Sequence, residues 1–83
     1  MEVKYVVLDE LYPIVFCGAL QHKDMADKRR ITSAGFCKIS IDKATGEIET
    51  FCYGKSVSLN ITPKENDNVL IKLLINDLWA FDV

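Results

Sequence analysis

Apolar and polar residues alternate in two stretches of the chain, Ile31–Asp42 and Ser56–Ile61, which is the pattern of strands with one buried face. Runs of β-branched and aromatic residues are bounded by residues typical of turns, such as Asp9, Glu10 and Pro13 after the first run. We therefore predict a hairpin from the first two strands and three strands after it. The predicted strands are Val3–Leu8, Ile14–Cys17, Ile31–Asp42, Glu47–Tyr53 and Ser56–Ile61.

The two longest of these strands are predicted to form a hairpin around residues 43–46, with Gly46 at a positive φ. A four-residue loop fixes the register, and a shift by one residue would reverse the faces. Three aromatic residues then share one face with Lys38, whereas two cysteines pack side by side on the other. The expected cross-strand pairs are Asp42–Glu47, Ile41–Ile48, Lys38–Phe51, Cys37–Cys52 and Phe36–Tyr53.

The last part of the chain predicts one long helix, from Pro63 to about Asp77. Thr62 suits the N-cap, Pro63 the first helical position, and Glu65 can reach back to the N–H of the cap. The second half, VLIKLLINDLW, is apolar on almost every side, which exceeds what one face of a small sheet can cover. Either the final LWAFDV folds back over it or a second subunit covers it, and we favour the subunit. The predicted oligomer interface is Leu70, Leu74, Leu78 and Trp79.

Together these elements predict a single α+β domain over residues 1–83. Its core would be a small antiparallel sheet of about five strands with the long C-terminal helix packed on one face. A short polar segment separates the second and third strands. In it, residues 21–30 contain too few apolar positions to predict a firm helix.

Composition narrows the classes of function. The net charge of −2 argues against non-specific binding of nucleic acid. The N-terminal apolar run is too short for a signal peptide and is followed by acidic residues, and no apolar run approaches the length of a membrane span. The three widely spaced cysteines and the single His22 do not form a metal-ligand pattern, so we predict no metal, no cofactor, reduced thiols and a cytoplasmic location.

Catalytic chemistry has one weak candidate. His22 followed by Asp24 or Asp27 has the composition of a general base with an orienting carboxylate. The alternative interpretation is an exposed loop histidine. No nucleophile is near in sequence, and the cysteines lie in predicted strands, where inert buried thiols are the usual case. We predict no catalytic residue and a protein that is not an enzyme.

Binding has more support. Adjacent arginines at positions 29 and 30 suit a phosphate or an acidic partner, and the small residues that follow allow close approach to the backbone. Gly35 is expected to lie near Gly54 across the hairpin and to leave a gap between two aromatic rings. The face that carries Phe36, Phe51 and Tyr53 is either a second core layer or a contact surface, and the sequence does not decide between the two. The predicted ligand- or partner-binding residues are Arg29, Arg30, Ser33, Gly35, Phe36, Tyr53, Gly54 and Lys55.

The segments QHKDMA, ITSAGFCKI and CYGKSVSLNI resemble a group of small bacteriophage and prophage proteins with no assigned activity. The resemblance covers roughly residues 13–75, and its most specific parts are SAGF and YGKSVSL. It implies an accessory protein of the bacterial cytoplasm. The expected function is a homo-oligomeric, non-enzymatic module that binds and inhibits a host defence or regulatory protein. The alternative is a module that sequesters or senses a small ligand such as a nucleotide signal.

Overall fold

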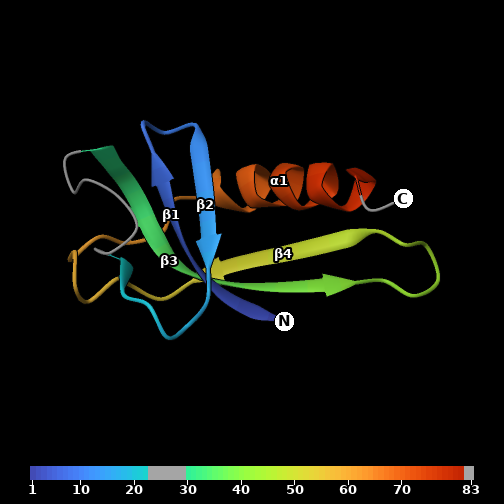
Figure 1. The fold of residues 1–83 in the computed structure, drawn as a ribbon, viewed down its shortest axis with the longest axis horizontal. Coiled ribbons are helices and arrows are strands. Elements are labelled where there is room, and N and C mark those ends of the chain that lie inside the picture. The colour runs from blue at the N-terminus through green and yellow to red at the C-terminus, as the bar shows by residue number, and fades with distance from the viewer. Residues whose placement is uncertain (23–29, 82–83) are drawn as a thin grey trace.

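The chain forms one open antiparallel sheet and one C-terminal helix (Figure 1). The computed structural model describes residues 1–22 and 30–81. The sheet order is β2-β1-β3-β4, and α1 lies beside the β3–β4 hairpin. The expected α+β class is confirmed, but the described residues form four strands and not five. The elements are β1 (Glu2–Leu8), β2 (Tyr12–Phe16), β3 (Ile31–Ile41), β4 (Ile48–Tyr53) and α1 (Asp67–Phe81).

The hairpin predicted at the N-terminus is present, although its turn is tighter than expected. Asp9 and Glu10 both adopt positive φ, at 51° and 63°, which side chains seldom tolerate. Their N–H groups donate to the carbonyl of Arg30 and to Oγ1 of Thr32, both at 2.9 Å, and these bonds hold the turn against β3. Pro13 lies inside β2, where an edge strand accepts the loss of one N–H.

The predicted β3–β4 register is confirmed. Cys37 faces Cys52, and the same alignment extends to Ile41 opposite Ile48. Gly46 closes the turn with φ +74°, as its position in the loop requires. Because the register holds, the side chains predicted to share a face do so along this hairpin.

A β-bulge near the start of β3 changes which face Ile31 occupies. Val7 faces Ser33 but Leu8 faces Ile31, so Thr32 is the extra residue. The Oγ1 atom of Thr32 donates to the carbonyl of Val7 at 3.2 Å and anchors the bulge. The alternation of Ile31–Asp42 would place Ile31 on the same face as Cys37, but the bulge places it on the opposite face.

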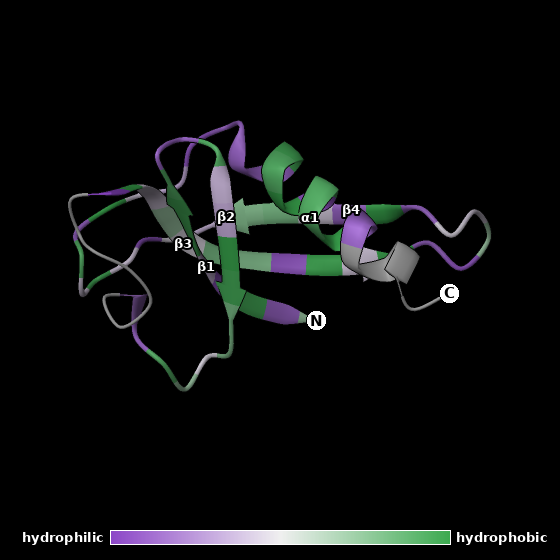
Figure 2. Cartoon of the chain, turned by 45° about the horizontal axis from the view of Figure 1, so that its top comes forward, coloured by the Kyte–Doolittle hydropathy of each residue, from purple (hydrophilic) through white to green (hydrophobic). Residues whose placement is uncertain are grey.

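Apolar side chains form two clusters, one on each face of the sheet. Ile71 is the fully buried contact of α1 with the first cluster, and Leu59 brings the loop after β4 onto the second. Figure 2 shows hydrophobic residues along the first part of α1 and along the second half of β2. The helix-side cluster is Tyr5, Val7, Cys37, Ile39, Ile48 and Ile71; the cluster on the other face is Val6, Phe16, Ile31, Ala34 and Leu59.

The predicted fifth strand is instead a compact loop. Only one bridge remains from it, between Ser56 and Ile61. The carbonyl of Ser56 accepts the N–H of Asn60 at 2.7 Å, and its hydroxyl accepts the N–H of Leu59 at 3.3 Å. Serine and asparagine bond locally to backbone and so compete with strand pairing. The predicted alternation fails as a result, since Ser56 is buried and Val57 is exposed.

The helix begins at Asp67, four residues after the predicted start at Pro63. Asp67, and not Glu65, supplies the carboxylate that reaches back, and it accepts the N–H of Lys64 at 2.9 Å. The N–H of Asp67 in turn donates to the carbonyl of Lys64 at 3.1 Å. A helix cap that uses a carboxylate of the first turn was therefore predicted correctly, but its position was wrong. Asp67 takes this role because its carboxylate also accepts hydrogen bonds from Tyr5 and Ser33 in the core.

Candidate functional site

The open part of the sheet carries a row of three aromatic side chains. We call Phe36, Tyr53 and Phe51 the aromatic row. The ring centroids of Phe36 and Tyr53 are 5.9 Å apart, and those of Tyr53 and Phe51 are also 5.9 Å apart, with nearly parallel planes in both pairs. Phe51 is 62% exposed. A large apolar ring held in that exposed position is characteristic of contact surfaces rather than of a core.

Lysines accompany the aromatic row. The Nζ atom of Lys38 lies 5.6 Å from the Tyr53 ring centroid, and that of Lys4 lies 6.0 Å from the centroid of Phe36. The Tyr53 hydroxyl donates a hydrogen bond to Glu2, which raises the pKa of Tyr53 to about 12. The face therefore combines exposed aromatic area with two ammonium groups and with the Glu2 carboxylate, which is already hydrogen-bonded.

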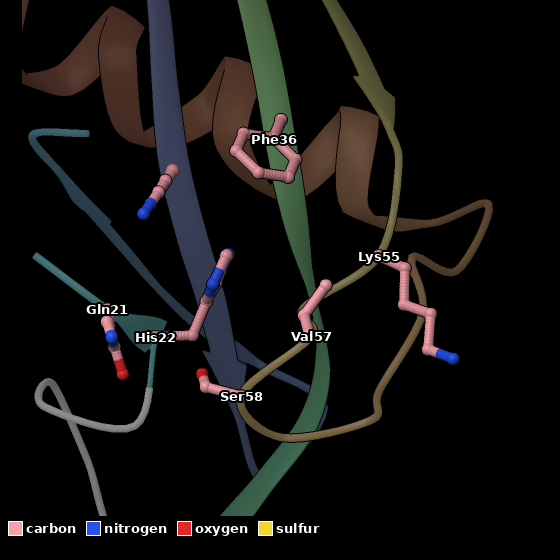
Figure 3. A pocket seen from close by; sticks show the side chains of 7 residues that line it. Gln21, His22, Phe36, Lys55, Val57 and Ser58 are labelled. Atoms are coloured by element: carbon pink, nitrogen blue, oxygen red, sulfur yellow. The ribbon is translucent and has the colours of Figure 1, made fainter.

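A cavity of about 420 Å³ lies beside the aromatic row. Figure 3 shows it between the segment that bears Gln21 and His22 and the loop after β4, with Phe36 projecting from β3. The lining residues come from four separate parts of the chain and meet only through the fold. They are Lys4, Gln21, His22, Phe36, Lys55, Val57 and Ser58.

His22 is a buried residue of the cavity wall. It is 3% exposed, and its Nε2 atom lies 2.7 Å from the carbonyl oxygen of Gly35. Its ring packs edge-on between Phe16 and Phe36, with centroid distances of 5.4 and 5.6 Å. The interpretation of an exposed loop histidine was therefore wrong, and the residue attaches its segment to β3. The expected partners Asp24 and Asp27 lie outside the described residues.

The gap expected between Gly35 and Gly54 is filled. A Cβ atom on Gly35 would lie 2.7 Å from the Tyr53 carbonyl oxygen and 2.8 Å from Cγ of Pro63. A Cβ atom on Gly54, whose φ is +80°, would lie 2.8 Å from the Phe36 ring. The two glycines serve close packing, and the open space lies on the other side of Phe36.

The predicted binding residues separate into two groups. Arg30 pairs with Asp9 at 3.2 Å at the far end of β3, and the buried Ser33 donates to Asp67 at 2.7 Å on the helix side. Phe36 and Lys55 line the cavity, with Tyr53 stacked beside Phe36. Arg29 lies outside the described residues. The structure therefore does not bring Arg30 and Ser33 to the aromatic row.

Five residues that line the cavity were not among the predicted binding residues, namely Lys4, Gln21, His22, Val57 and Ser58. Lys4 faces Phe36 across the β1–β3 pair, and the alternation of VKYVV would have placed it on that face once the strand order was known. No pattern in the sequence signals the burial of His22. It depends on the rings of Phe16 and Phe36, which come from different strands.

The two strand-paired cysteines lie away from the aromatic row. Cys37 is buried in the helix-side cluster and Cys52 packs against it. The neighbouring Cys37 thiol and burial raise the pKa of Cys52, which disfavours a reactive thiolate. Cys17 is exposed and free.

Within residues 1–22 and 30–81, no helix is long and apolar enough to cross a membrane, and no three His, Cys, Asp or Glu side chains gather as metal ligands would. The chain matches no family model, no curated protein and no solved structure.

Proposed function

We propose that the chain is a non-enzymatic binding module that docks on an acidic surface of a host protein through the aromatic row. The observation that carries the proposal is Phe51, which is 62% exposed and yet stacks against the Tyr53 ring two residues along the same strand. Aromatic anchors supply most of the binding free energy in protein interfaces. Lys38, beside the row, would select a partner of negative charge.

A protein partner suits this face better than a strand of nucleic acid. Glu2 hydrogen-bonds with Tyr53, and the exposed Glu49 lies two residues before Phe51 on the same side of β4. These carboxylates would repel a phosphate backbone, which is negative along its whole length, whereas a protein partner can place a single carboxylate beside Lys38. The whole chain has a net charge of −2. Aromatic residues are enriched at protein interfaces, and the rim of such an interface is polar and solvent-accessible.

The proposal that the module has no catalytic activity rests on what the candidate groups already do. His22 is buried against the Gly35 carbonyl, and Cys37 is enclosed in the helix-side cluster. Both side chains therefore support the fold. Resemblance to bacteriophage proteins adds the biological setting to the proposal: a module in the bacterial cytoplasm that inhibits a host defence or regulatory protein by occupying its surface.

Self-association is a second part of the proposal, with α1 as the contact. Val69 and Leu73 lie one turn apart and are 54% and 56% exposed. Leu70 packs against the helix-side cluster and Leu74 is half-buried, so the outward apolar surface is centred on different residues from those predicted. The side chains of Leu78 and Trp79 lie outside the described part, and their role stays a prediction.

Affinity capture from bacterial lysate tests the docking surface when it compares three forms of the protein. The wild type should retain a protein that Phe51→Ala loses, because truncation removes the exposed anchor. Leu11→Ala is the matched control, since it removes an equally exposed apolar side chain from the turn between β1 and β2, outside both proposed contact surfaces. Equal capture by the wild type and Phe51→Ala would refute docking through the aromatic row.

A further inference from the structure

The cavity beside the aromatic row has the chemistry of a site for a small anionic aromatic molecule. Its volume of about 420 Å³ lies within the range of small-molecule sites. Among the described residues that line it are two lysines, Lys4 and Lys55, and no carboxylate. Phe36 supplies an apolar wall, and Ser58 supplies a hydroxyl that both donates and accepts. A ligand that uses all of these groups needs an aromatic ring, polar ring edges and a negative charge.

The positive group at the cavity is fixed before any ligand arrives. Lys4 donates one hydrogen bond to the carbonyl of Leu20 at 2.7 Å. An ammonium group has three donors, so two remain for a phosphate oxygen. The Phe36 ring also lies beneath this ammonium group, at 6.0 Å from its centroid. The side-chain entropy of Lys4 is therefore largely lost on folding and not on binding.

The aromatic wall is equally constrained. The His22 ring meets Phe36 at a centroid distance of 5.6 Å and nearly at right angles, and the Tyr53 ring stacks at 5.9 Å. Gly54 touches the Phe36 ring so closely that a methyl group there would overlap with it. A ring held by three neighbours offers a rigid surface for a planar base.

From this geometry we infer that the cavity binds a free mononucleotide, with the base packed against Phe36 and the phosphate at Lys4 and Lys55. Ser58 then contacts the base or sugar. The site does not depend on the proposed protein docking, because neither Phe51 nor Lys38 lines the cavity. A long polyanion is disfavoured, because Glu2 and Glu49 lie farther along the same face.

Titration with AMP, GMP, CMP and UMP, followed by amide NMR and by melting temperature, tests the assignment. At least one nucleotide should shift the amide signals of Lys55, Val57 and Ser58 and raise the melting temperature. Adenosine and inorganic phosphate should each bind far more weakly, because adenosine lacks the phosphate that contacts the lysines and phosphate lacks the base that packs against Phe36. Lys55→Ala should weaken nucleotide binding by about ten-fold, whereas the exposed turn substitution Lys43→Ala should leave it unchanged.

Three results would overturn the assignment. The first is that no nucleotide at millimolar concentration shifts the cavity amides. The second is equal weakening by Lys55→Ala and Lys43→Ala, which would indicate non-specific charge attraction. The third is tighter binding of a single-stranded oligonucleotide than of any mononucleotide, which would make the face a nucleic-acid surface. Phe51→Ala should retain nucleotide binding, so loss of protein capture and loss of this site can be told apart.

Discussion

The hydroxyl of Tyr5 donates a hydrogen bond of 2.6 Å to Oδ2 of Asp67, although the two residues lie 62 positions apart in the sequence. The same carboxylate accepts the Ser33 hydroxyl at 2.7 Å and the Lys64 N–H at 2.9 Å. Asp67 is almost wholly buried. It therefore joins β1, β3 and the start of α1, and it determines where the helix begins.

Replacement of Asp67 by alanine should strongly destabilise the fold. It would leave the buried hydroxyls of Tyr5 and Ser33 without an acceptor, at a cost of about 2–4 kcal/mol in the free energy of unfolding. Urea denaturation followed by circular dichroism measures this cost. The exposed helix substitution Asp77→Ala is the control and should change stability by less than about 0.5 kcal/mol. Similar effects of both substitutions would contradict the account of the helix start.

Stability should fall at alkaline pH. Burial and the bond to Asp67 raise the pKa of Tyr5 above 10.0. A raised native pKa means that the folded state holds its proton more tightly. This stability is fully present below the ordinary value and is lost as the pH rises above it, by up to about 1.4 kcal/mol per pH unit. Tyr5→Phe should give a shallower decline above pH 10.0 in the same denaturation series; an unchanged slope would contradict this origin.

Local pattern was sufficient to predict the β3–β4 hairpin, because the turn length and the alternation specify the same register. It failed where side chains bond to backbone or across the fold. Ser56 and Asn60 close a loop where alternation predicted a strand. The helix begins at Asp67 rather than at the predicted position because the Asp67 carboxylate accepts hydrogen bonds from Tyr5 and Ser33 in the core. Contacts of that kind are set by tertiary structure.

Substitution of Gly35 by alanine should destabilise the protein by about 1–3 kcal/mol, because the added methyl group meets the Tyr53 carbonyl and Pro63 at less than a contact distance. Gly18→Ala is a matched control in the same chain. A Cβ atom there meets nothing within 4 Å, so the change should be neutral or stabilising by up to about 1 kcal/mol. Melting temperatures of the two variants measure the contrast. A tolerated alanine at position 35 would show that Pro63 is not packed there.

The candidate site was only partly predictable because part of it depends on tertiary contacts. Phe36, Phe51 and Tyr53 could be assigned to one face from the hairpin alone, since Phe36 pairs with Tyr53 and Phe51 lies two residues before Tyr53 on the same strand. The cavity could not, because it depends on the loop shape after β4 and on the burial of His22. Arg30 was a reasonable candidate by charge, yet the direction of β3 carries it to the opposite end of the sheet, where it pairs with Asp9.

If α1 is the self-association surface, the double substitution Val69→Ser with Leu73→Ser should convert an oligomer to a monomer, because it removes the exposed apolar pair without touching the buried Ile71. Sedimentation velocity of the wild type and the variant over a range of concentrations measures this. A wild type that sediments as a monomer at every concentration would contradict self-association while leaving the aromatic row unaffected.

The most direct test of docking through the aromatic row is the affinity of the captured partner for a Lys38→Glu variant. Lys38 lies beside Tyr53 on the proposed surface, whereas Lys43 is equally charged and exposed in the β3–β4 turn. Isothermal titration calorimetry should show that Lys38→Glu weakens binding by about ten-fold or more, with Lys43→Glu close to the wild type. Equal affinities of the wild type and Lys38→Glu, or equal losses in both variants, would contradict recognition of an acidic partner by this face.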